Sequence, residues 1–311
     1  MKQKLFILVI AGLSSANAYA QSDFDFSQRW FNESLYNPAA VGNSLSTGFF
    51  LHTRSQWLGL DGAPITLAGA FDYFNQPLHS GFGATVAADY IGVYQTYNFR
   101  LAYAYYMQFA SGAMMSFGLS AGVLARHTDI NAAQLDEPGD PVVDYNRDKE
   151  YTPDFDFGLE YKGAFKFGVT VRHIGVRAMA DSRYAPSVNI WAYLSSRFNI
   201  TRSMSVEPIA SFTYRRDIYR AEAGALLYFF KTRNLHTYND RFWIGAVYRS
   251  DHNIALLAGM NLTSRIRIGY SFDYGVDDVV NIATYGTHEL FFAYQFNRQF
   301  YKDVCCPALR N

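Results

Sequence analysis

Few residues of this chain have the types and spacing that catalysis needs. None of its seven histidines lies at His-Glu-x-x-His or zinc-finger spacing, and the chain has no phosphate-binding loop. The run Ser250-Asp251-His252 has the residue types of a hydrolase, which would need such side chains to meet near one rim of the fold. We therefore predict that the protein is not an enzyme and has no cofactor or metal site.

Other reactive or charged groups have structural interpretations. Asp154 and Asp156 fit the polar face of one strand. The two cysteines, Cys305 and Cys306, are adjacent in the C-terminal tail, whereas a disulfide framework would distribute cysteines through the chain. The net charge is zero and there is no run of Lys or Arg, so we predict no nucleic-acid partner.

From about Gly48 onwards, apolar and polar residues alternate in segments of roughly ten residues. Residues 154–162 are the clearest case, and residues 265–274 are a second. A β-strand sends successive side chains to opposite faces, so each segment has one apolar and one polar face. In a soluble sandwich a second sheet covers the apolar face, whereas in an outer-membrane barrel that face contacts lipid and the polar face lines the lumen.

The N-terminal sequence favours the barrel because it predicts export. Residues 1–20 combine a charged start, a short apolar stretch and the cleavage signal Ala18-Tyr19-Ala20. We therefore predict a signal peptide that is cleaved after Ala20. No later stretch approaches the roughly 20 apolar residues that a membrane-spanning helix needs, so a membrane location would require strands.

The composition agrees with strands that have one lipid face and one lumen face. Aromatic residues make up 17% of the chain and charged residues 17%, against roughly 25% charged residues in soluble domains. The mean hydropathy of −0.10 excludes a helical membrane protein. We predict an all-β fold, namely a closed transmembrane antiparallel β-barrel that lies in the cell outer membrane and contacts its lipid.

The alternation predicts about fourteen strands, at 48–57, 64–75, 80–91, 96–109, 113–126, 153–162, 165–173, 186–198, 203–214, 219–230, 241–250, 252–262, 265–274 and 288–297. An even number returns the C-terminus to the side where the N-terminus begins, so we predict that both termini are periplasmic. The longest connections, at 127–152, 174–185 and 275–287, then lie on the extracellular side.

The chain divides into four predicted parts: the signal peptide at 1–20, an N-terminal segment at 21–43, the barrel at 44–300 and a tail at 301–311. The N-terminal segment precedes the alternation and is a candidate plug or periplasmic docking segment. Fourteen strands lie between filled eight-stranded barrels and open porins of 16 or more, so the lumen is predicted to be a narrow pore or to be plugged.

Two blocks of residues near the start of the mature chain form a distinctive pattern. The first block is Phe26-Ser27-Gln28-Arg29-Trp30-Phe31 followed by Leu35-Tyr36-Asn37-Pro38-Ala39 and Gly42. The second is Arg54, Gln56-Trp57, Gly59-Leu60 and Gly62-Ala63-Pro64. Together the two blocks resemble the PorP/SprF family of outer-membrane proteins in Bacteroidota. Weaker matches continue along the mature chain as far as Glu289-Leu290 and Tyr294. The family often has Pro or an apolar residue where this chain has Glu33-Ser34.

This resemblance implies a role in the type IX secretion system. Members of the family support secretion or hold proteins such as gliding adhesins at the cell surface, and none is taken to be an enzyme. The implied partners are a secreted or cell-surface client protein and other components of the system. The alternative that the sequence leaves open is a porin-like channel for small solutes.

The first predicted outer hairpin is the candidate partner-binding site, formed by Trp57, Leu58, Gly59, Leu60, Asp61 and Gly62. Leu58 and Leu60 would be costly to expose in a plain loop, which favours a contact with a client. The alternative is structural: Trp57 lies in the interfacial aromatic belt, and Gly59 and Gly62 permit the turn.

Overall fold

The structure is a computed structural model that describes residues 23–42, 47–128, 149–179, 186–216, 218–230, 240–276 and 284–296. The predicted signal peptide and the C-terminal tail with its cysteines lie outside the described residues. Within these ranges, no helix is long and apolar enough to cross a bilayer. The single α-helix there is the short α2 (Val176–Met179).

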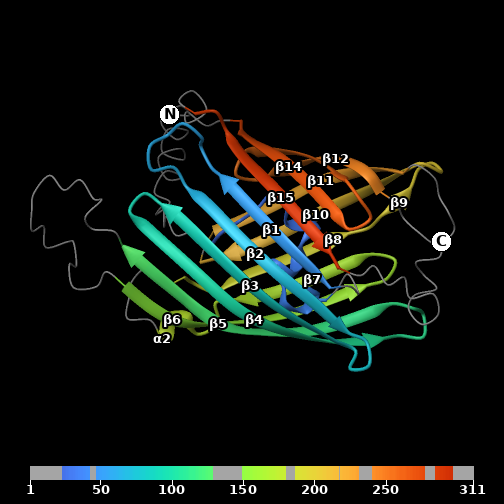
Figure 1. The fold of residues 1–311 in the computed structure, drawn as a ribbon, viewed down its shortest axis with the longest axis horizontal. Coiled ribbons are helices and arrows are strands. Elements are labelled where there is room, and N and C mark those ends of the chain that lie inside the picture. The colour runs from blue at the N-terminus through green and yellow to red at the C-terminus, as the bar shows by residue number, and fades with distance from the viewer. Residues whose placement is uncertain are drawn as a thin grey trace, which may run out of the picture.

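Antiparallel strands form one closed sheet (Figure 1). The strands are β1 (Gly48–Ser55), β2 (Ile65–Asn75), β3 (Ser80–Ile91), β4 (Tyr94–Gln108), β5 (Met114–Thr128), β6 (Lys149–Lys162), β7 (Lys166–Arg172), β8 (Asn189–Ser195), β9 (Phe198–Asn199), β10 (Met204–Arg215), β11 (Ile218–Phe230), β12 (Asp240–Arg249), β13 (Asn253–Asn261), β14 (Ile266–Gly275) and β15 (Thr287–Gln295). Strands that are neighbours in sequence pair, except that β8 and β9 both pair with β10, and β15 pairs with β1 to close the barrel.

The two-residue strand β9 is the continuation of β8 after a short interruption. Both strands pair with β10 in one register, because Ser195 pairs with Ile209 and Phe198 with Val206. Pro208 lies between those two partners and has no N–H to donate to the ladder. With β8 and β9 taken as one strand, the ring has fourteen strands, which confirms the predicted number and the closed barrel.

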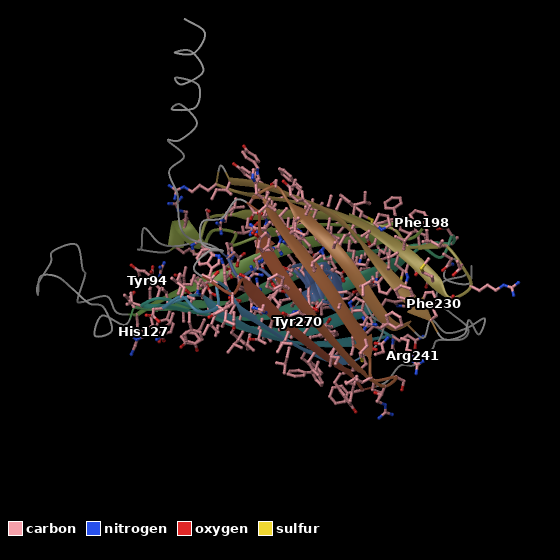
Figure 2. The ribbon with its side chains drawn as sticks, turned by 90° about the horizontal axis from the view of Figure 1, so that it is seen from above. Tyr94, His127, Phe198, Phe230, Arg241 and Tyr270 are labelled. Atoms are coloured by element: carbon pink, nitrogen blue, oxygen red, sulfur yellow. The ribbon has the colours of Figure 1, made fainter. Side chains whose placement is uncertain are left out.

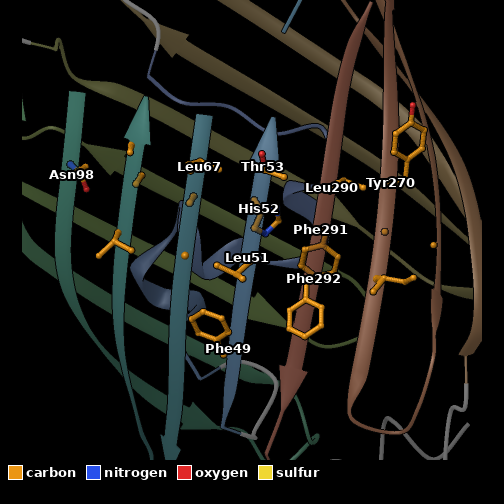
Figure 3. Close-up of a pocket in the computed structure, with 18 of the residues that line it drawn as sticks. Phe49, Leu51, His52, Thr53, Leu67, Asn98, Tyr270, Leu290, Phe291 and Phe292 are labelled. Atoms are coloured by element: carbon orange, nitrogen blue, oxygen red, sulfur yellow. The ribbon is translucent and has the colours of Figure 1, made fainter. Parts of the chain in front are cut away.

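The two faces of the wall differ as the alternation predicts. Along β1, Leu51 is 45% exposed on the outer face while His52 is 3% exposed on the inner face. Figure 3 shows these residues on β1 and Phe291 on β15, with the N-terminal segment behind the strands. An apolar groove of about 1670 Å3 crosses this side and is lined by exposed residues such as Leu67 and Leu290, so it belongs to the lipid-facing surface.

The barrel has two unlike ends. The end where β1 finishes carries the connections 56–64, 129–148, 173–188 and 276–286, and we call it the long-connection end. The opposite end carries short turns such as 76–79 and 163–165, and we call it the short-turn end. Figure 2 shows Tyr94 and His127 at the first end and Phe198, Phe230 and Arg241 at the second.

Residues 23–42 lie inside the barrel. They contain three short 3-10 helices, η1 (Arg29–Phe31), η2 (Glu33–Leu35) and η3 (Pro38–Ala40). Their apolar side chains are buried against lumen-facing aromatic residues: Tyr36 packs 5.4 Å from Trp191 and Phe31 packs 4.9 Å from Trp243, measured between ring centroids. The apolar core of the molecule is therefore formed between this segment and the wall.

The segment crosses the lumen from one end to the other. Asp23 contacts Arg172 at the end of β7 and Asn189 at the start of β8, both at the long-connection end. Gly42 lies against Gly81 at the short-turn end, where β1 begins and Phe296 follows β15. Asp23 and Phe296 thus lie at opposite ends, and a shared periplasmic location of the two termini stays a prediction.

Candidate functional site

The turn Asn37-Pro38-Ala39 anchors the N-terminal segment to the wall near the short-turn end. The Asn37 side chain caps η3 by accepting a 3.0 Å hydrogen bond from the Ala39 N–H, and Pro38 occupies the first helical position. The Asn37 amide also donates to the Leu159 carbonyl at 3.2 Å and to the Tyr193 hydroxyl at 3.1 Å. One side chain therefore holds the turn and two wall strands together.

Glycines in the wall allow the turn to approach this closely. A Cβ built on Gly118 would lie 2.2 Å from the Ala39 nitrogen, and one on Gly81 would lie 1.9 Å from the Val41 oxygen. Real Cβ atoms do not tolerate such distances, so these positions require glycine. The Ser116 and Tyr106 hydroxyls complete the contact by donating to the backbone carbonyls of Ala39 and Val41 at 2.7 Å each.

Two buried ionic networks hold the other half of the segment at the long-connection end. In the first, Arg29 pairs with Glu222 at 2.6 Å and with Asp25 at 3.0 Å. Arg249 links Glu222 at 3.1 Å to Asp273 at 3.0 Å. The whole first network contains four arginines and four carboxylates: Arg29, Arg54, Arg220, Arg249, Asp25, Glu222, Asp273 and Glu289.

The second network surrounds Asp23. Its carboxylate lies 2.6 Å from Arg172 Nη1 and 3.1 Å from His173 Nε2. His173 Nδ1 lies 2.9 Å from Asp154, and Asp156 pairs with Arg100 at 2.8 Å. Three carboxylates thus face two arginines and one histidine, so the charges balance when His173 is protonated.

The pKa values outside the strands agree with this charge assignment. Burial opposes ionisation of Asp23, but Arg172 and His173 hold the pKa of that carboxyl well below its usual range. Burial likewise opposes ionisation of Asp25, and Arg220 and Arg29 lower its pKa. For His173, burial disfavours the charged ring, but Asp23 and Asp154 raise its pKa from 6.5 to about 9.

Asp154, Asp156 and His173 bring their ligand atoms within 4.8 Å of one another, a spacing that a metal ion would also use. The bonds that they make point to an ionic cluster. Asp154 accepts from Asn98 at 2.9 Å, and Asp156 accepts from Arg100 at 2.8 Å and from Ser120 at 2.9 Å. A cation would have to displace Arg100, so we assign the cluster to the contact with the N-terminal segment.

The predicted partner-binding hairpin forms a ridge at the long-connection end of the barrel, between β1 and β2. The Leu58 N–H donates to the Gly286 carbonyl at 2.9 Å, and the Tyr285 N–H donates to the Leu58 carbonyl at 2.8 Å. On the other side, the Gly92 N–H donates to the Gly62 carbonyl at 3.0 Å. Both flanks of the hairpin are therefore fixed by backbone hydrogen bonds.

The ridge presents apolar side chains to its surroundings. Leu58 and Leu60 are each 46% exposed, and Tyr285, from a neighbouring connection, is 77% exposed. Gly59, Asp61 and Gly62 are also exposed, while Trp57 is half-buried. Gly59 and Gly62 have φ values of 98° and 71°, which the turn requires and which glycine adopts without strain.

The run Ser250-Asp251-His252, which has the residue types of a hydrolase, has a structural role. Residues 250–252 form an exposed turn between β12 and β13. The Ser250 hydroxyl there accepts a 3.0 Å hydrogen bond from the Ala221 N–H, a contact that fixes the turn.

Sequence reasoning missed the ionic networks, although it placed Asp154 and Asp156 on a polar strand face. The sequence does indicate part of these networks, because Arg172, Glu222 and Asp273 all occupy lumen positions in the alternation. Their grouping near one end could be found only by combining the strand order with the register. The acidic residues Asp23 and Asp25 carried no such signal, since they precede the strands.

Comparisons with known proteins agree with this architecture. The family model described as type IX secretion system membrane protein PorP/SprF matches residues 18–294. No curated protein matches the sequence significantly. Among solved structures, the CymD monoaromatic hydrocarbon channel is similar, with a TM-score of 0.50, 11% identity, and coverage of 88% of this chain and 94% of that chain.

Omp33 of Acinetobacter baumannii has a TM-score of 0.45 and 13% identity, covering 81% of this chain and all of the other. At 11% identity the CymD structure shows the barrel fold alone. The family match extends over most of the chain and includes the Asn37-Pro38-Ala39 turn, the glycine-lined wall and the ridge. The chain therefore belongs to the PorP/SprF family of type IX secretion system membrane proteins, and it is built as an outer-membrane β-barrel.

Proposed function

We propose that this barrel supports the secretion or the surface attachment of a partner protein, such as a gliding adhesin, through contacts at its long-connection end. Membership of the type IX system supplies the setting in which such a partner is exported. The observation that carries the proposal is the ridge at residues 57–62, which is apolar, exposed and fixed on both flanks.

The rigidity of the ridge distinguishes it from an ordinary surface loop. A mobile loop with two leucines would hide them against its neighbours. Here the backbone is bonded at Leu58 to Gly286 and at Gly62 to Gly92, so the stretch that carries Leu58 and Leu60 is fixed on both sides. Exposed apolar groups on a fixed backbone lose little conformational entropy on binding, which favours recognition of a protein surface. Asp61 is the one charged side chain of the hairpin, so the expected contact is mainly apolar.

The filled lumen supports an interaction role over a solute channel. Trp30, Leu35 and Tyr36 are buried in the interior of the barrel. Charged side chains of the N-terminal segment also form ion pairs with charged side chains of the wall. A diffusive pore would need a continuous hydrated path, and the residues at 23–42 occupy the space where that path would run. The channel is the second candidate because the structurally similar CymD is named as a monoaromatic hydrocarbon channel.

The experiment is a comparison of ridge variants in the native cell. Leu58→Asp and Leu60→Asp place charges on the ridge, and the matched control is Leu78→Asp, which is 58% exposed at the short-turn end. Surface and secreted proteins are measured by mass spectrometry, and barrel assembly is measured by the heat-modifiable electrophoretic band.

We expect the ridge variants to lose specific surface or secreted proteins while the barrel assembles normally, and Leu78→Asp to resemble the wild type. Unchanged surface and secreted proteins in both ridge variants would remove the ridge from the proposal. Unchanged proteins after deletion of the whole chain would remove the secretion role itself.

A further inference from the structure

The first described residues alternate acidic and aromatic side chains, and the wall around them offers matching groups. We call residues 23–26 (Asp-Phe-Asp-Phe) the latch. Asp23 bonds Arg172 Nη1 at 2.6 Å and Asn189 Nδ2 at 3.1 Å, while Asp25 pairs with Arg29 and Arg220. Each latch carboxylate thus has its own arginine partners.

The aromatic residues of the latch pack against cationic and aromatic side chains of the wall. The guanidinium carbons of Arg172 and Arg100 lie 5.2 and 5.7 Å from the Phe24 ring centroid, within the range of cation–π attraction. The Phe26 ring packs 5.0 Å from the His52 ring. We call the wall residues Arg100, Arg172, His173, Asn189 and Arg220 the socket.

The latch does not use the full bonding capacity of the socket. Arg172 is buried and uses Nη1 for Asp23, but its Nε and Nη2 have no hydrogen-bond partner among the described residues. The Asn189 side-chain oxygen likewise has no hydrogen-bond partner among the described residues. A carboxylate that approached Arg172 in a bidentate manner would form two charge-assisted bonds where Asp23 forms one.

Electrostatics would make an empty socket attractive to acidic groups. Asp23 and Asp25 supply one negative charge to each of the two balanced networks. When both leave, each network keeps one uncompensated positive charge in a buried position, which is costly unless other carboxylates replace them. The Cα atoms of residues i and i+2 in an extended segment lie roughly 7 Å apart, so a segment with the same spacing as the latch fits.

The latch can leave while the rest of the segment stays in place. The next residues, Ser27 and Gln28, are fixed separately because their N–H groups donate to the Glu289 carboxylate at 2.8 and 3.2 Å. The turn at Asn37 is held against glycines at the other end of the lumen. Displacement of four residues therefore does not require removal of the whole segment.

We propose that the socket is a peptide-binding site and that the latch is its intramolecular occupant. The partner segment would be extended and would carry two carboxylates two residues apart, with aromatic side chains between and after them. It would displace the latch from the long-connection end, where the ridge also lies. This inference rests on the proposed function because it names the chemistry of the partner that the barrel engages.

The test uses full-length protein purified in detergent and a fluorescently labelled synthetic peptide, Asp-Phe-Asp-Phe-Ser, whose binding is followed by anisotropy. The peptide Asn-Phe-Asn-Phe-Ser is the charge control. The protein variants are Asp23→Asn combined with Asp25→Asn, which weakens the latch, and the same pair with Arg172→Gln, which disables the socket. Phe24→Ala weakens the latch without changing any charge and serves if the double variant does not assemble.

We expect the latch-weakened protein to bind the acidic peptide at least about tenfold more tightly than the wild type, because a larger fraction of its sockets is empty. Arg172→Gln should abolish this gain, and the asparagine peptide should not bind. Equal affinity for wild-type and latch-weakened protein, or a gain that persists with Arg172→Gln, would overturn the proposal. Peptide binding and the secretion phenotype are measured in separate experiments. A negative binding result therefore rejects the peptide site alone, and an unchanged secretion phenotype rejects the proposed function.

Discussion

A Cβ atom built on Gly158 would lie 1.9 Å from Oδ1 of Asn37, so the wall and the N-terminal turn meet with no space between them. Asn37 comes from the segment inside the lumen, and Gly158 from the lumen face of β6. The contact makes the segment an integral part of the folded barrel, and its consequences can be measured.

The first prediction concerns this contact. Gly158→Ala should destabilise the barrel by about 1–3 kcal/mol, because the added methyl group forces the Asn37 side chain out of its place as in an overpacked core. Gly69→Ala is the matched control, since its Cβ would face lipid with ordinary contacts of 3.4 and 3.6 Å. The measurement is the temperature at which the compact electrophoretic form disappears. Equal temperatures for the two variants would contradict the prediction.

The second prediction concerns the first ionic network. Glu222→Gln should cost about 3–5 kcal/mol, because it leaves the charges of Arg29, Arg220 and Arg249 in a buried site without their shared carboxylate. Urea unfolding followed by tryptophan fluorescence measures the effect. Asp251→Asn in the exposed turn is the control and should change the free energy of unfolding by less than about 0.5 kcal/mol.

The third prediction is a pH dependence. His173 has a folded pKa of about 9 against an ordinary value of 6.5, so its contribution to stability is complete below pH 6.5 and is lost as the pH rises through 9. The lowered pKa of Asp23 has the opposite sign, and its contribution is lost as the pH falls below 3.8. We expect stability to decline between pH 6.5 and 9 in the wild type, and His173→Gln to remove most of that decline.

The control for this pH series is Leu78→Ala, which changes an exposed side chain at the short-turn end and no ionisable group. It should leave the pH profile of the unfolding temperature close to that of the wild type. A wild-type profile that is flat from pH 6.5 to 9 would contradict the role of His173.

The fourth prediction concerns conductance. The wild type should show no steady stepwise current in planar bilayers, because residues 23–42 occupy the lumen. A variant that lacks residues 23–36 should conduct in its assembled fraction, whereas Leu58→Asp, which leaves the segment intact, should stay closed. Stepwise currents of equal size in all three proteins would favour the channel over the interaction barrel.

The strands could be predicted almost completely from the sequence, because a two-residue period follows directly from backbone geometry. Most predicted boundaries agree with the structure within a few residues, as for residues 80–91, which match β3. The interruption between β8 and β9 could not be predicted in this way. Its cause, Pro208, lies on the neighbouring strand, and the pairing of the two strands is not a local property of either.

The contacts inside the barrel were less accessible to sequence reasoning. Arg29 and Glu222 are separated by 193 positions, and their meeting depends on the ring order, the register and the path of the segment together. The sequence predicts partner binding at residues 57–62 from the cost of exposing leucines. The structure shows those leucines exposed and adds Tyr285, which comes from a connection that no local pattern relates to the hairpin.

The path of residues 23–42 from one end of the lumen to the other constrains the order of assembly. A segment with a bulky interior of Trp30, Leu35 and Tyr36 would pass through a finished ring only with difficulty. We therefore expect the wall to close around the segment, which requires that at least one strand pair, such as that of β1 and β15, forms after the segment is in place. The segment would then serve as a template around which the barrel closes. We expect its deletion to slow insertion of the barrel into the membrane as well as to empty the lumen.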